Sequence, residues 1–163
     1  KEIKTTRINF NLKEIEIKYF TQENKLKLYN RFLDKFYNLE KNEFIDYFDY
    51  IQSEKGDKKL IYLNSPKKIE EFSKDLYEKI NIGKIESKEI NLIKDQISKF
   101  LHPDFYINKL IDKGIIYLHG KVPDFIKDYL EYKFKEIKDL RYISANSVVL
   151  SCAFDGSHFR IIS

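Results

Sequence analysis

The stretch of residues 114–150 constrains the fold more than any other part of the chain. It reads GIIYLHGKVPDFIKDYLEYKFKEIKDLRYISANSVVL. The short apolar run at 115–118 is typical of a strand, and a second such run lies at 141–144. Between them, a helix is predicted from Pro123 by apolar residues that share one face: Ile126, Leu130, Phe134 and Ile137. A strand–helix–strand unit predicts two parallel strands whose carboxyl ends meet at one sheet edge, where open α/β sheets bind ligands.

The segment before this unit continues the alternation of strands and helices. Residues 59–64 form an apolar run suited to a buried parallel strand. Ser65 and Pro66 then predict a helix start, because a hydroxyl caps the first turn and proline fits the first helical position. That helix is expected to end near Gly83, and two more helical patterns precede Gly114. The whole pattern predicts an α/β fold with a parallel β-sheet flanked by helices.

The first 57 residues show a different pattern. Residues 6–20 alternate loosely with a period of two, which favours strands. Residues 22–51 show apolar residues at helical spacing, with a joint at 40–43. We therefore expect residues 1–57 to hold lead-in strands and an N-terminal helical insertion packed on the same domain, and residues 58–163 to form its α/β core.

Composition restricts the class of protein without naming a partner. The 163 residues fit one domain, and a net charge of +4 from 30 basic and 26 acidic residues does not argue for nucleic-acid binding. The single cysteine, Cys152, excludes an intrachain disulfide and fits a reducing compartment. No apolar run reaches the roughly 20 residues that span a bilayer, so we expect a cytoplasmic protein without membrane contact. A start at Lys1 rather than methionine is what a piece of a longer protein would show.

Three segments, in order, carry a resemblance to a known family. Residues 60–65 (LIYLNS) match an "LVFxxSR" motif, residues 114–123 (GIIYLHGKVP) match "GIxxHHGxLP", and residues 140–150 (LRYISANSVVL) match the "VLVATST" portion of a later motif. These motifs belong to the second RecA-like domain of DEAD/DEAH-box superfamily 2 helicases, which residues 58–150 resemble. The resemblance implies a RecA-like sheet and a parent protein that couples ATP to movement along a nucleic-acid strand.

In that family the residues after these strands hold the phosphate backbone of a single strand of DNA or RNA. The resemblance therefore implies these nucleic-acid-binding residues: Asn64, Ser65, His119, Gly120, Lys121, Ser144, Asn146 and Ser147. Without the family, Ser65 is a helix cap and His119 a structural histidine. Short hydroxyl and amide side chains nevertheless suit phosphate contacts, which position a strand without reading its sequence. A first RecA-like domain would be the second partner.

The departures from the family concern ATP. Residues 151–156 (SCAFDG) stand where the family has Glu-Gly-Val-Asn-Leu-Pro, and Leu118 replaces the first histidine of the pair. No phosphate loop, Asp-Glu-x-His box or arginine-finger motif is found, so we expect the chain alone not to hydrolyse ATP. No catalytic residue is predicted, cofactor-binding residues are unknown, and ATP and Mg²⁺ would belong to the complete parent. Cys152, Asp155 and His158 make only a weak metal-ligand pattern, and no metal site is predicted.

Three interpretations remain. The first is the second motor domain of a helicase or translocase, of a kind found in DNA repair and phage defence. The second is a degenerate RecA-like scaffold or protein-interaction domain, favoured by the departure at 151–156 and by the modest net charge. The third is an unrelated small α/β enzyme, against which the absence of a nucleophile elbow or paired catalytic carboxylates counts.

Overall fold

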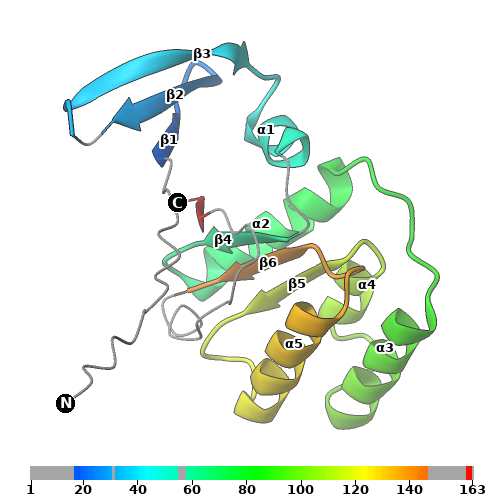
Figure 1. Ribbon diagram of the computed structural model, residues 1–163. Helices are drawn as coiled ribbons and strands as arrows, with labels where there is room; N and C mark the ends of the chain where they lie inside the picture. The colour runs from blue at the N-terminus through cyan, green and yellow to red at the C-terminus, as the bar shows by residue number, and fades with distance from the viewer. Residues whose placement is uncertain (1–16, 31, 55–57, 147–160, 163) are drawn as a thin grey trace, which may run out of the picture. The chain divides into compact units, whose positions relative to one another are not determined.

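The computed structural model describes residues 17–30, 32–54, 58–146 and 161–162 (Figure 1). The chain divides into two compact units, Lys1–Tyr50 and Ile51–Ser163. The first unit holds the strands β1 (Ile17–Phe20), β2 (Lys25–Asn30) and β3 (Lys35–Glu43). The helix α1 (Tyr47–Ser53) contains the boundary between the two units. The prediction that the N-terminal region packs on the same domain stays a prediction.

The first unit is an antiparallel sheet in the order β1-β2-β3. Its two turns depend on residues that tolerate left-handed backbone, Asn24 at φ +57° and Asp34 at φ +49°. In the second turn, the Asn30 side-chain oxygen accepts from the backbone N–H groups of Phe32 and Leu33, at 3.0 and 3.1 Å. Asparagine and aspartate favour turns because their short side chains bond to the neighbouring backbone.

The helix predicted before the joint, over residues 22–39, is wrong, because this region forms β2 and most of β3. Tyr29 and Phe36, seven positions apart, would share a helical face, but here they are partners across the hairpin with ring centroids 5.1 Å apart. The spacing of Tyr29 and Phe36 therefore does not distinguish a helix from a short hairpin, because the two residues are neighbours in both. The expected joint at 40–43 lies within β3. The second helical stripe does contain a helix, α1, whose first turn is capped by the Asp46 carboxylate accepting from two backbone N–H groups at 2.9 Å.

The second unit confirms the α/β class. Its elements are β4 (Lys59–Tyr62), α2 (Pro66–Lys79), α3 (Lys88–Phe100), α4 (Ile107–Ile111), β5 (Ile115–Leu118), α5 (Asp124–Glu136), β6 (Tyr142–Ala145) and β7 (Ile161–Ile162). The strands are parallel, in the order β5-β6-β4-β7. In register, both Tyr62 and Leu118 lie opposite Ala145, so β4, β5 and β6 end at one carboxyl edge.

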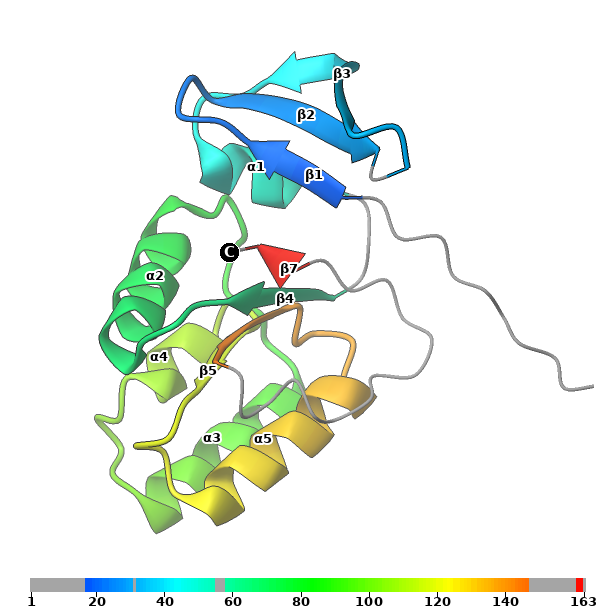
Figure 2. The ribbon, with the colours of Figure 1, turned by 90° about the vertical axis from the view of Figure 1, so that its left-hand side faces the viewer.

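Helices cover both faces of this sheet. Figures 1 and 2 show α2 and α5 on opposite sides of it. Right-handed crossovers produce this arrangement, because the connection from β4 to β5 and the connection from β5 back to β6 run in opposite directions along the sheet. The apolar stripes predicted for both helices are buried: Ile69, Phe72, Leu76, Ile126, Leu130 and Phe134.

The start of α2 is as predicted, but its end is not. The Ser65 hydroxyl accepts from the Lys68 N–H at 3.2 Å, and Pro66 is the first helical residue. Gly83 does not form the expected glycine cap, because the helix ends at Ile80 in an extended conformation. The Lys113 ammonium instead donates to the carbonyls of Tyr77 and Ile80, at 2.7 and 3.2 Å. A cation at a helix C-terminus satisfies unpaired carbonyls and complements the helix dipole.

Gly114 fixes the start of β5 beside β6. Its φ is +72°, and a Cβ at this position would lie 2.2 Å from the Asp139 carbonyl oxygen. Its own carbonyl accepts from the backbone N–H groups of Arg141 and Tyr142, at 2.8 and 3.0 Å. Only glycine combines this backbone conformation with such a close approach.

Candidate functional site

Three of the predicted segments meet at the carboxyl edge of the parallel sheet. Asn64 and Ser65 follow β4, His119 to Lys121 follow β5, and Asn146 follows β6. The three strands are adjacent in the sheet and end in register. Ser147 lies outside the described residues. Segments that are far apart in the sequence therefore form one edge.

The predicted residues differ in accessibility. Asn64, Gly120 and Lys121 are exposed, and Ser65 and Asn146 are half-buried. His119 is 3% exposed and Ser144 is 0% exposed, so in this structure neither side chain is accessible to a strand bound at the edge. The accessible part of the candidate site consists of the turn after β5 and the start of α2.

His119 is held in a polar cluster below this turn. Its ring stacks on Tyr117, with centroids 5.2 Å apart and planes 6° apart. Its Nδ1 accepts from the Lys121 backbone N–H at 3.2 Å. Because Nδ1 accepts, the proton of the neutral ring lies on Nε2. Nε2 is 3.0 Å from a Glu70 carboxylate oxygen but is oriented too poorly for a well-formed hydrogen bond.

Burial keeps the His119 imidazole and the Tyr117 phenol uncharged at neutral pH. Burial lowers the pKa of His119, the nearby Lys121 and Lys127 lower it further, and Glu70 opposes them. Burial also raises the pKa of Tyr117 to about 12, with smaller contributions from Glu70 and Tyr106. A neutral imidazole that accepts from the Lys121 N–H orders the turn, which is a positioning role rather than a proton-transfer role.

Two buried polar oxygens at this edge have no hydrogen-bond partner in the part of the chain that the structure describes. Among the described residues, neither the Ser144 hydroxyl nor the Asn146 side-chain oxygen has a hydrogen-bond partner. Ser144 is the register partner of Tyr117, so both side chains are on one face of the sheet. Most buried polar groups in proteins are paired, so an unpaired one needs a specific explanation.

Two lysines near the edge were missed by the sequence prediction of site residues. Lys67 and Lys68 are exposed in the first turn of α2, which contains no acidic residue. Cations are unfavourable at a helix N-terminus by about 0.3–1 kcal/mol each, because the helix dipole is positive there. Two lysines at an unfavourable position of the helix were therefore the feature of the sequence from which this part of the site could have been predicted. Lys67 lies 3.7 Å from Glu71 in a surface ion pair, which is a weak interaction.

Gly120 is not required by the chain's own packing. Its φ is not in the left-handed region, and a Cβ added there would meet no atom of the described residues within 4 Å. The same is true of Gly83, in the loop after α2. Gly120 therefore leaves open space at the edge beside Lys121.

The arrangement suits anion binding better than acid–base catalysis. It combines exposed lysines, a helix N-terminus and an open turn, which attract phosphate groups. No three His, Cys, Asp or Glu side chains in the described ranges gather as metal ligands, and Cys152, Asp155 and His158 lie outside those ranges. Within the described part of the chain, none of the helices has the length and apolarity needed to cross a membrane.

Comparison with protein-family models gives no match, and comparison with curated proteins gives no significant match. Inference about function therefore depends on the geometry of this chain and on the motif resemblance.

Proposed function

We propose that this chain is the second RecA-like motor domain of an ATP-dependent superfamily 2 helicase or translocase, and that the carboxyl edge of its sheet holds the phosphate backbone of a single nucleic-acid strand. One observation carries the proposal. The three segments that resemble helicase motifs follow β4, β5 and β6, which are adjacent parallel strands that end in register. A shared binding site requires this convergence, which neither composition nor net charge predicts.

Lys67, Lys68 and Lys121 supply the positive charge in this proposal. All three are exposed, and they flank the N-terminus of α2 and the turn after β5. Their ammonium groups contact phosphates, which gives binding that depends on salt and tolerates any base sequence. His119 contributes indirectly by holding the backbone N–H of Lys121.

The chemistry of ATP belongs to the complete parent protein in this proposal. A first RecA-like domain supplies the phosphate loop and the Mg²⁺ ligands, and ATP binds between the two domains. Opening and closing of the pair then moves them along the strand. The isolated chain binds the strand without hydrolysing ATP.

One observation favours the alternative, a degenerate scaffold that binds no strand. His119 and Ser144, two of the residues that the resemblance assigns to the strand, are buried. If the chain is such a scaffold, nucleic acid should show no salt-dependent binding at the carboxyl edge.

The test is fluorescence anisotropy of the whole chain with labelled single-stranded DNA and RNA across a salt series. For single strands, each neutralised phosphate adds roughly 0.7 to the slope of log affinity against log salt. Lys121→Glu is expected to weaken binding several-fold at low salt and to reduce that slope by about 0.7 or more. The matched control is Lys84→Glu, the same charge change at an exposed residue in the loop after α2.

Two results would overturn the proposal. One is the absence of binding to either nucleic acid at low salt. The other is an equal effect of Lys84→Glu and Lys121→Glu, which would reduce the binding to non-specific attraction by net charge.

A further inference from the structure

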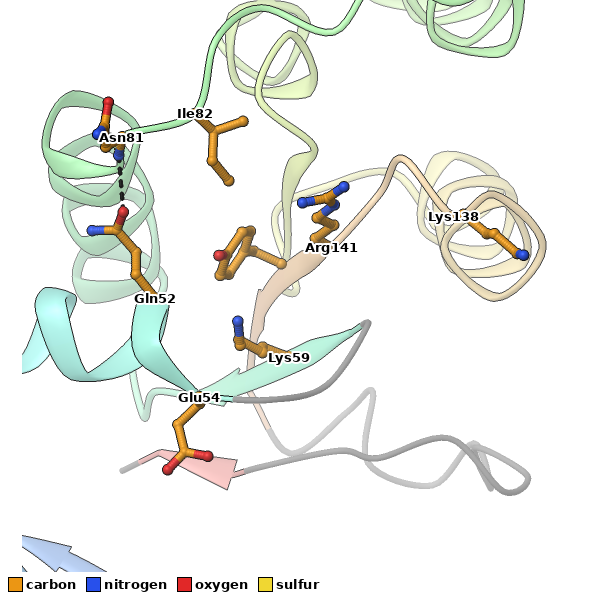
Figure 3. A pocket seen from close by; sticks show the side chains of 8 residues that line it. Gln52, Glu54, Lys59, Asn81, Ile82, Lys138 and Arg141 are labelled. Carbon is orange, nitrogen blue, oxygen red and sulfur yellow. Dashed lines mark hydrogen bonds between the residues drawn. The ribbon is translucent and has the colours of Figure 1, made fainter. Parts of the chain in front are cut away.

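A second concave region lies at the opposite, amino edge of the parallel sheet (Figure 3). It has a volume of about 580 Å³ and is lined by residues at the start of β4 and β6, at the end of α1 and just after α2. This size is within the range of roughly 300–1,000 Å³ that is usual for small-molecule sites. None of the described residues that line it belongs to the carboxyl edge.

The walls of this hollow are fixed by hydrogen bonds. The Asn81 backbone N–H donates to the Gln52 side-chain oxygen at 2.9 Å, which joins the loop after α2 to the end of α1. The backbone N–H groups of Arg141 and Tyr142 donate to the Gly114 carbonyl. Tyr142 is buried, and the Lys59 ammonium lies 5.0 Å from the centre of its ring. A site with such supported walls is formed before any ligand arrives.

Three other buried or partly buried lysines of this unit, Lys58, Lys94 and Lys113, have conventional polar partners. Lys58 donates to the backbone carbonyls of Phe134 and Lys135 at the end of α5. Lys113 donates to carbonyls at the end of α2, and Lys94 contacts the Asp112 carboxylate at 2.5 Å. Buried cations are stable in proteins when they are paired in one of these ways.

Lys59 is different from these lysines. It is 8% exposed, and no carboxylate or carbonyl among the described residues pairs with its ammonium. Burial lowers the pKa of Lys59, and the nearby Arg141 guanidinium lowers it further. Figure 3 shows the Lys59 ammonium extending toward the side of the hollow where Arg141 lies, while the Glu54 carboxylate extends the other way. Lys59 and Arg141 therefore line one hollow, whose other charged lining residues are the cation Lys138 and the carboxylate Glu54.

We infer that this hollow binds a small phosphorylated molecule, with its phosphate group between Lys59 and Arg141. A phosphate dianion neutralises both cations at once, and a guanidinium can bind two of its oxygens. The Gln52 and Asn81 amides and the Tyr142 ring line the remaining space for the rest of the molecule. The ligand is a small molecule rather than a strand, because the hollow has the volume of one such ligand.

The test is isothermal titration calorimetry of the whole chain with inorganic phosphate and with adenosine 5′-monophosphate, each at an ionic strength matched with chloride. Binding to both is expected at pH 7.5. Because charged hydrogen bonds contribute about 1.5–3 kcal/mol, Lys59→Met and Arg141→Gln should each weaken binding roughly tenfold to a hundredfold. Lys84→Gln, which removes a lysine outside the hollow, should bind with unchanged affinity.

The pH dependence gives a second readout. The second pKa of a phosphate monoester is about 6, so affinity should fall as pH decreases through that value. Lys59→Met keeps the length of the side chain and removes its charge, and Arg141 is exposed, so at least one variant should fold normally by circular dichroism.

Two results would overturn the inference: no heat of binding with either probe, or equal affinities in the unaltered chain and both folded variants. The outcome is independent of the nucleic-acid proposal. Lys59→Met should leave the anisotropy of single-stranded nucleic acid unchanged, because Lys59 lies at the other edge of the sheet.

Discussion

The two edges of the parallel sheet differ in how far the chain's own packing determines them. At the amino edge, Gly114 is crowded against a carbonyl oxygen, and Lys58 is locked onto the end of α5. At the carboxyl edge, Gly120 has open space around it, and Lys121 is exposed. Gly114 and Lys58 at the first edge are therefore needed for folding, whereas Gly120 and Lys121 at the second are not. A residue that packing does not require is the more informative about function.

The largest effect is expected for Gly114→Ala. A non-glycine residue in the left-handed conformation costs about 1–3 kcal/mol, and the contact of the new Cβ with the Asp139 carbonyl adds to that cost. Urea unfolding should show a loss of at least this size. Gly83→Ala is the matched control, because its Cβ meets no atom. Equal stabilities of the two variants would contradict the crowded conformation at Gly114.

Lys58→Met should be the next most destabilising change. It leaves the carbonyls of Phe134 and Lys135 without the Lys58 donor, at a cost of about 2 kcal/mol. The neighbouring change, Lys59→Met, should leave the free energy of unfolding equal or higher, because it removes a buried charge without a conventional partner. Urea midpoints of the two variants test the difference. A loss of stability in Lys59→Met as large as that in Lys58→Met would show that Lys59 has a structural partner.

His119 should make stability depend on pH. Its folded-state pKa is lowered, chiefly by burial, so below about pH 6.5 the unfolded chain binds more protons than the folded chain. Stability should therefore fall as pH decreases from 6.5 toward the lower, folded-state pKa, by at most about 1.4 kcal/mol per pH unit from this residue. His119→Asn keeps an acceptor near the Nδ1 position without titrating, and urea unfolding at pH 5 and 7.5 should show a smaller difference in this variant. An unchanged difference would assign the pH dependence to other groups.

Gly120→Ala should have the smallest effect on stability and the most informative effect on binding. The backbone conformation at Gly120 suits alanine, so the replacement should raise the free energy of unfolding by about 0.4–1 kcal/mol, because it reduces the entropy of the unfolded chain. The added methyl group lies at the proposed strand-binding edge, so single-stranded nucleic acid should bind more weakly. Gly83→Ala controls for the general effect of removing a glycine. If Gly120→Ala binds single-stranded nucleic acid as tightly as the unaltered chain, the strand does not closely approach the backbone at Gly120.

The parallel half of the molecule could be predicted from the sequence because its signals are local. The strand runs at 59–64 and 115–118, the Ser65-Pro66 helix start and the apolar stripe of α5 each need only neighbouring residues. In the antiparallel unit, β1 lies within the strand pattern predicted over residues 6–20. Strands β2 and β3 were missed because apolar spacing alone does not separate a helix from a short hairpin. The turn residues Asn24 and Asp34 carried the missing signal.

The candidate sites were predicted unequally for a similar reason. The carboxyl-edge segments could be found because motifs name them, although burial of His119 and Ser144 depends on α2 and on neighbouring strands, which no motif encodes. The amino-edge hollow could not be predicted. Lys59 and Arg141 are far apart in the sequence and line one hollow only because Lys59 is the register partner of Tyr142.

The strand order also determines when this fold can form. β4 comes first in the parallel sheet's sequence, but its neighbours in the sheet are β6 and β7, which come last. A growing chain that has not yet reached Tyr142 therefore holds an apolar strand with neither of these neighbours to pair with. Such non-local pairing slows folding and leaves strand edges exposed in the meantime. The central strand of the sheet is therefore paired on both sides only after Tyr142 and Ile161 have been synthesised.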